Sequence, residues 1–92
     1  MIKSFKCADT EAISKGIRVR RFVNIAEVAR RKLRQLEIAG RLNDLRIPPG
    51  NRLEALKGDR LGQYSMRINN QWRVCFRWEG AGAEDVEIVD YH

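Results

Sequence analysis

Two alternating stretches in the C-terminal half constrain the fold of this chain more than any other feature. Within "QYSMRIN" (63–69) and "WRVCFRW" (72–78), every second residue is apolar. These residues are Tyr64, Met66 and Ile68 in the first stretch and Trp72, Val74, Phe76 and Trp78 in the second. A side-chain period of two predicts two β-strands that each bury one apolar face. Because only a short polar segment separates them, we expect an antiparallel hairpin.

The register of this hairpin follows if the two apolar faces coincide. The opposed pairs are then Ile68 and Trp72, Met66 and Val74, and Tyr64 and Phe76, with residues 69–71 as the loop.

The same register gathers arginines on the other face of the hairpin. Arg67 falls opposite Arg73, with Cys75 and Arg77 further along. Like charges opposed across a ladder are unfavourable by a few tenths of a kcal/mol, unless an anion lies over them. Either this face binds an anion such as phosphate, or each arginine pairs with an acid from elsewhere, Glu87 being a candidate.

The remaining elements are predicted from shorter signals. Residues 2–6 alternate weakly and could form a first strand, and "ADTEAISKG" (8–16) predicts a short helix that ends at Gly16. A longer helix is predicted over "NIAEVARRKLRQLEIAG" (24–40), where Asn24 and Glu27 resemble a capping box. Its apolar residues form one stripe: Ile25, Val28, Ala29, Leu33 and Leu36.

The proline pair after that helix interrupts the pattern. Pro48 and Pro49 exclude a continuing helix, and residues 52–62 are expected to form a loop. A last strand, "DVEIVDY" (85–91), follows the turn-like "EGAGAED". The fold class is therefore α+β, with two N-terminal helices packed on an antiparallel sheet. At 92 residues, we expect one domain covering residues 1–92.

Composition restricts the partners and the cell compartment. The chain has 18 Lys and Arg against 12 acids, and between residues 15 and 34 eight basic residues accompany one acid. This asymmetry favours a polyanion such as nucleic acid, although a solvated basic helix face gives the same pattern. No apolar run is long enough to cross a membrane, and "MIKSFK" lacks the apolar segment of a signal peptide, so we expect a cytoplasmic protein.

The potential metal ligands are few. Cys7 and Cys75 form no CxxC pair, and the single histidine, His92, does not complete a zinc set with them. We expect free cysteines, no structural metal and no cofactor.

RNA cleavage without metal is compatible with this composition. It needs a base for the 2′-hydroxyl proton, cations for the charge on phosphorus, and an acid for the leaving 5′-oxygen. His92 has an ordinary pKa near neutrality and suits the acid role, which leaves Asp90 or Glu54 as candidate base. Tyr91 could stack on a base or cover the sheet edge. From the residues alone, a disordered chain end is the preferred interpretation of the terminal histidine.

Several motifs together resemble the HigB family of bacterial toxins, within the RelE-like superfamily of messenger-RNA interferases. The most specific are "LKGDR", "INNQWRVCF" and "DYH". The resemblance extends over essentially the whole chain, including "MIKSF". It implies a small RelE-like α/β RNase fold and cleavage of mRNA in the A site of the 70S ribosome.

The resemblance also implies partners and residue roles. A cognate HigA-like helix-turn-helix antitoxin would hold the toxin inactive, and operator DNA would be bound only through the toxin-antitoxin complex. By motif, Asp90, Tyr91 and His92 take proton-transfer and base-stacking roles. Lys57 and Arg73 become phosphate or transition-state contacts. The predicted RNA contacts are Arg67, Arg60 and Arg77.

One departure from the family pattern concerns the base. Some relatives have a histidine just before "LKG", where this chain has Glu54 in "LEALKG". A carboxylate with an ordinary pKa of about 4.3 can accept the 2′-hydroxyl proton but is a poor acid at neutral pH. Glu54 and Asp90 therefore remain alternatives for the base, and activity weaker than in those relatives is expected.

Two other function classes compete with cleavage. The basic surface could hold RNA without chemistry, as in a degenerate toxin that acts mainly as an antitoxin-bound co-repressor. A DNA-binding protein acting alone is disfavoured, because the long helix is evenly basic and no helix-turn-helix partner is visible.

Overall fold

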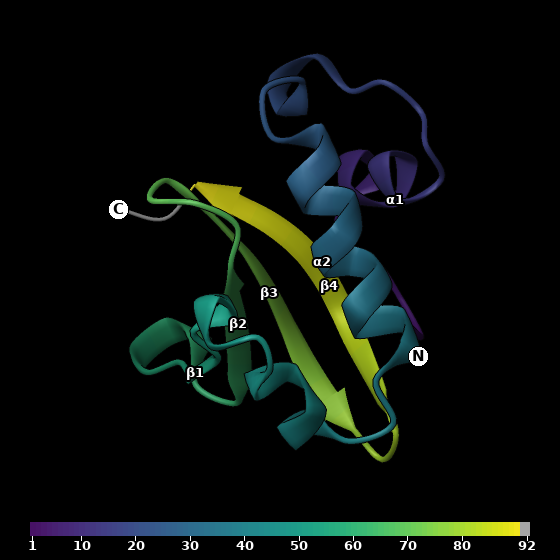
Figure 1. Ribbon diagram of the computed structural model, residues 1–92. Helices are drawn as coiled ribbons and strands as arrows, with labels where there is room; N and C mark the ends of the chain where they lie inside the picture. Colours follow the sequence, from purple (N-terminus) through teal and green to yellow (C-terminus); the bar gives the residue numbers. More distant parts are fainter. Residues whose placement is uncertain (91–92) are drawn as a thin grey trace.

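A computed structural model describes residues 1–90 of the chain. Helices α1 (Ala8–Ser14) and α2 (Ala26–Ile38) precede a four-stranded antiparallel sheet in the order β1-β2-β3-β4 (Figure 1). The strands are β1 (Glu54–Ala55), β2 (Gln63–Arg67), β3 (Trp72–Glu79) and β4 (Gly82–Asp90). Short 3₁₀ turns occupy Arg20–Phe22, Leu42–Arg46, Pro49–Asn51 and Gly58–Arg60. The expected α+β class is confirmed.

The predicted register of the β2–β3 hairpin is confirmed. Met66 pairs with Val74 and Arg67 with Arg73, and the Ile68 amide donates to the Trp72 carbonyl at 2.9 Å. The apolar face was sufficient to set this register, because a slip by one residue would move every side chain to the opposite face.

One face of the sheet is covered by the helices and forms the core. Met66, Val74 and Phe76 are fully buried there, beneath Leu33 and Leu36 of α2. Aromatic pairs also pack on this face. The ring centroids of Trp72 and Phe22 are 5.4 Å apart in an edge-on arrangement. Phe76 stacks on Tyr64 and contacts Trp78 edge-on. We call this the covered face.

Two predictions at the N-terminal half need correction. Residues 2–6 form only two isolated parallel bridges to β4, Ile2 with Ala83 and Phe5 with Val86, rather than a continuous strand. Helix α2 starts at Ala26 without a side-chain cap, so the predicted capping box at Asn24 is wrong. Burial fixes the helix start instead, because Phe22 and Ile25 pack into the core just before it.

The sheet also differs from prediction at two places. Residues 52–62 were expected to be a loop, yet Glu54 and Ala55 form β1, which is too short to show an alternating pattern. Strand β4 begins at Gly82, so the turn before it is shorter than "EGAGAED". Gly82 is required there, because a Cβ would lie 2.8 Å from the Met1 carbonyl of the crossing N-terminal segment.

Candidate functional site

The second face of the sheet carries the polar residues, and we call it the open face. Pairing across the strands defines two of its rows: Glu54, Ser65, Cys75 and Glu87, and next to it Arg67, Arg73 and Val89. A third row holds Gln63, Arg77 and Glu84. The sheet therefore places three of the predicted RNA or transition-state contacts, Arg67, Arg73 and Arg77, on one surface.

Arg73 is held in place by three oxygen atoms. Its Nε donates to Ser65 Oγ at 2.8 Å, and its Nη2 donates to the Arg52 carbonyl at 2.8 Å. The same Nη2 lies 3.8 Å from Glu54 Oε1. The Arg73 side chain is only 10% exposed, whereas that of Glu54 is 53% exposed. The structure thus brings a fixed guanidinium beside an accessible carboxylate.

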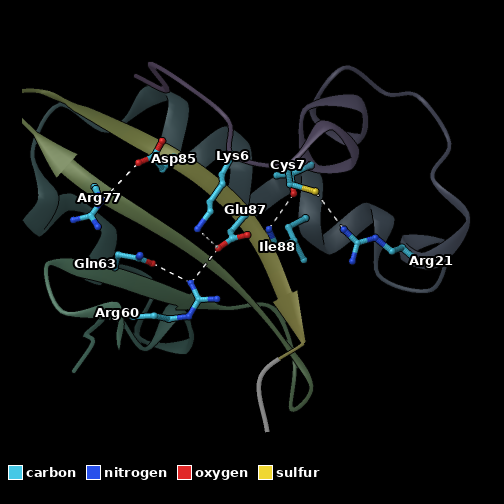
Figure 2. Close-up of polar contacts among 10 residues, drawn as sticks. Lys6, Cys7, Arg21, Arg60, Gln63, Arg77, Asp85, Glu87 and Ile88 are labelled. Atoms are coloured by element: carbon cyan, nitrogen blue, oxygen red, sulfur yellow. Dashed lines mark hydrogen bonds and ion pairs between the residues drawn. The ribbon is translucent and has the colours of Figure 1, made fainter. Parts of the chain in front are cut away.

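Arg60 lies across the open face and contacts residues of both β2 and β4. Figure 2 shows its guanidinium between Gln63 and Glu87, with Nη1 3.0 Å from Gln63 Oε1 and 3.0 Å from Glu87 Oε1. Lys6 Nζ approaches the same Glu87 oxygen at 3.8 Å. Arg60 comes from the 3₁₀ turn that follows Lys57, so this contact also fixes the turn.

Two arginines of the hairpin on the open face pair with acids from other segments. Arg73 pairs with Glu54 and Arg77 with Asp85, the latter at 3.6 Å (Figure 2). Glu87, a candidate partner for the arginines of the hairpin, pairs with Arg60 instead. Acids from other segments therefore neutralise part of this face.

Arg67 and Lys57 lie at the margins of the open face. Arg67 is half-buried, and its Nη2 donates to Asn70 Oδ1 in the hairpin loop. Lys57 is exposed and directly precedes the turn that carries Arg60. Arg67 also pairs with Arg73 in the β2–β3 register, and Lys57 follows β1, which carries Glu54.

Asp90 lies at the end of β4, away from that pair. It is opposite Trp72 in the register, and its Oδ2 accepts from Gln71 Nε2 at 3.0 Å. Since side chains alternate along a strand, Asp90 points to the same side as Trp72, which is the side of the covered face. The predicted roles of Tyr91 and His92 fall outside the described residues.

Cys75 lies beneath the open face and is fully buried. Burial raises the pKa of its thiol, although the charges of Arg60 and Arg73 act in the opposite direction. Both cysteines are free thiols. Within residues 1–90, no group of three His, Cys, Asp or Glu could hold a metal ion.

Two residues that hold Arg73, Ser65 and Arg52, were not among the predicted site residues. Ser65 could have been found, because the predicted register places it opposite Cys75 and diagonal to Arg73. The Arg52 carbonyl could not, because its direction depends on a left-handed backbone conformation with φ of 46°.

The sequence of the chain matches the model of a known family. The model of the RelE-like toxin of the type II toxin-antitoxin system HigB matches residues 14–92. The chain belongs to this HigB-like toxin family. Toxin HigB-1 of Vibrio cholerae serotype O1 is 52% identical over 48 residues, which is 52% of this chain and 50% of the relative.

A second relative is an uncharacterised protein of Haemophilus influenzae. It is 39% identical over 56 residues, covering 61% of this chain and 55% of the relative. The chain therefore matches about half the length of these curated relatives. In the described part of this HigB-like chain, no helix is long and apolar enough to cross a membrane.

Proposed function

We propose that this chain is the toxin of a type II toxin-antitoxin pair and that it cleaves mRNA on the ribosome by acid-base chemistry through the 2′-hydroxyl. Family membership supports the toxin role. The observation that carries the proposed chemistry is the Glu54 carboxylate 3.8 Å from the Arg73 guanidinium. Together these groups supply a proton acceptor and a fixed positive charge on one surface.

Glu54 is the better candidate for the base. Its side chain is half exposed beside Arg73, whereas the register directs Asp90 to the other side of the sheet. An ionised carboxylate can accept the 2′-hydroxyl proton while the oxygen attacks phosphorus. We assign the proton donor for the leaving 5′-oxygen to His92, on the basis of the "DYH" motif and the imidazole pKa. Tyr91 of that motif is assigned to base stacking.

Arg73 would stabilise the negative charge that builds on phosphorus. A guanidinium already held by Ser65 and the Arg52 carbonyl needs little reorganisation when that charge develops. Lys57 and Arg67 extend the positive surface along the RNA backbone. Arg60 and Arg77 are engaged by Glu87 and Asp85, so we expect them to contribute less to RNA binding.

Ribosome dependence follows from the small number of catalytic groups. A domain of this size with one carboxylate and one arginine at its centre gains most from a bound message that is already oriented. The proposed partners are therefore the ribosome with its mRNA, and an antitoxin that resembles HigA.

Expression without the antitoxin tests the proposal. The wild-type chain should arrest growth, and an Arg73→Ala, His92→Ala variant should not, while still binding the antitoxin in a pull-down. Growth arrest by the double variant would refute the assignment of the site. Normal growth with soluble wild-type protein would favour the competing function, an antitoxin-bound co-repressor.

A further inference from the structure

Asn51 is a buried polar residue that connects α2 to the segment before β1. Its side chain is fully buried. Lys32 Nζ donates to its Oδ1, and its Nδ2 donates to Gln35 Oε1 at 2.9 Å, with both partners on α2. The same Nδ2 donates to the carbonyls of Leu45 at 3.1 Å and Ile47 at 3.4 Å. One amide thus holds two turns of the 42–51 segment against the helix.

Only an amide side chain can form all of these hydrogen bonds with Lys32, Gln35 and the two carbonyls. The oxygen accepts from an ammonium group while the nitrogen donates to three oxygens, which neither a carboxylate nor an alkyl group can do. Burial and the nearby charges of Arg31 and Arg67 lower the pKa of Lys32. A buried polar group left without its partner is destabilising, so the hydrogen bonds of Asn51 depend on an amide at this position.

The residue that follows Asn51 contacts the proposed site. Arg52 adopts a left-handed conformation, φ 46° and ψ 55°, which is unfavourable for a non-glycine residue and needs support from its surroundings. In this conformation its carbonyl meets Arg73 Nη2 at 2.8 Å. Two residues later, Glu54 approaches the same nitrogen. The position of the Arg52 carbonyl therefore depends on what fixes the chain at residue 51. Glu54 also pairs with Ser65 of β2, but β1 has only two residues, so the anchor at residue 51 contributes to the position of Glu54 as well.

Arg73 has a second anchor that does not involve Asn51. Ser65 on β2 accepts from its Nε, and the β2–β3 ladder holds both residues. Loss of the Asn51 tether would displace Arg52 and Glu54 while Arg73 stays on the sheet. We propose that Asn51 is a positioning residue that sets the Glu54 carboxylate against the Arg73 guanidinium, an inference that rests on the proposed RNA cleavage.

An Asn51→Leu variant tests this role, with Asn43→Leu as the matched control. Asn43 lies in the same segment but is exposed, and its Oδ1 accepts a hydrogen bond from Arg46 Nε. Cleavage is measured in a reconstituted translation reaction at saturating and limiting message. We expect the rate at saturation to fall by about 10- to 100-fold for Asn51→Leu, with little change in KM. Asn43→Leu should match the wild type.

Coupling to Arg73 separates positioning from general destabilisation. In an Arg73→Ala background, Asn51→Leu should cause no further loss, because the pair it positions is already broken. Losses that multiply in the double variant would overturn the proposal. Should Asn51→Leu fail to fold, Gln35→Leu removes one acceptor of the tether at the half-exposed helix surface and takes its place, with the same expected coupling.

A second readout does not depend on cleavage. Nitrogen NMR of the Arg73 guanidinium reports its hydrogen bonds, and Asn51→Leu should change the Nη signals while the Nε signal, set by Ser65, stays in place. Unchanged Nη signals would overturn the positioning role. If the wild type cuts no RNA while the Nη signals shift, the proposed function fails but the tether between Asn51 and Arg73 holds.

Discussion

The two faces of the sheet are built from the same strands but satisfy different physical requirements. On the covered face, Met66, Val74 and Phe76 are fully buried in apolar contacts, which set the register and hold the helices. On the open face, Arg73 is almost as buried, yet it is surrounded by hydrogen-bonding oxygens. Burial on this face therefore fixes a charge in place instead of excluding polar groups.

The comparison shows that folding stability and the geometry of the candidate site depend on different faces of the sheet. Apolar contacts on the covered face stabilise the folded state in proportion to the apolar area that they bury, with no requirement for a particular direction. The contacts of the open face contribute mainly geometry, because exposed ion pairs such as Arg77 with Asp85 are worth little in water. We therefore expect substitutions on the two faces to affect different measurements.

The largest expected effect is on the covered face. Phe76→Ala removes a fully buried ring and should lower the free energy of unfolding by about 3–5 kcal/mol. The matched change on the open face, Arg77→Ala, should stay within about 0.5 kcal/mol, because that side chain is half exposed. Urea unfolding followed by circular dichroism measures both. Equal losses would show that the two faces do not differ as described.

The next effect concerns activity on the open face. Glu54→Gln keeps the size of the side chain but removes the proton acceptor, so cleavage should fall by about 100-fold or more, with stability nearly unchanged. Asp90→Asn should cost less, because Asp90 is opposite Trp72. Glu27→Gln, exposed on α2, is the control. A larger loss for Asp90→Asn in the translation reaction would reverse the assignment of the base.

The smallest expected effect is a difference in labelling rate between the thiols of Cys7 and Cys75. Partial burial alone would raise the pKa of Cys7, but hydrogen bonds from Thr10 and Asp9 and the charge of Arg21 lower it. Figure 2 shows the Arg21 guanidinium beside the sulfur. Because Cys75 is fully buried with a raised pKa, iodoacetamide at neutral pH should label Cys7 at least about tenfold faster.

Arg60→Ala sharpens this comparison. Removing the side chain that crosses from Gln63 to Glu87 should open the face above Cys75 and speed its labelling, with Cys7 as the internal control. Mass spectrometry of the labelled peptides measures both rates. Labelling of Cys75 at the rate of Cys7 in the wild type would contradict the closed packing of the open face.

The parts of the fold and of the candidate site that could be predicted are those where a residue pattern extends over several positions. The alternation over residues 63–78 gave the register and the opposition of Arg67 and Arg73, both confirmed. The approach of Glu54 to Arg73 could not be predicted, because β1 has two residues and shows no period.

The partners of the other charges also escaped prediction. Arg60 reaches Glu87 across 27 positions of sequence, and Asn51 reaches Lys32 across 19. Such contacts depend on how loops pack against the sheet and the helix, which no local pattern encodes. The family motifs predict which residues act on RNA, but they do not show how these residues are held.

The central claim is that the Glu54 and Arg73 pair on the open face cuts messenger RNA, and mapping of transcript 5′ ends in cells tests it most directly. Cells that produce the wild-type chain without its antitoxin should show new 5′ ends within translated messages. These ends should disappear with Glu54→Gln and with Arg73→Ala, at equal amounts of soluble protein. The same 5′ ends in either variant, or none with the wild type, would contradict the account.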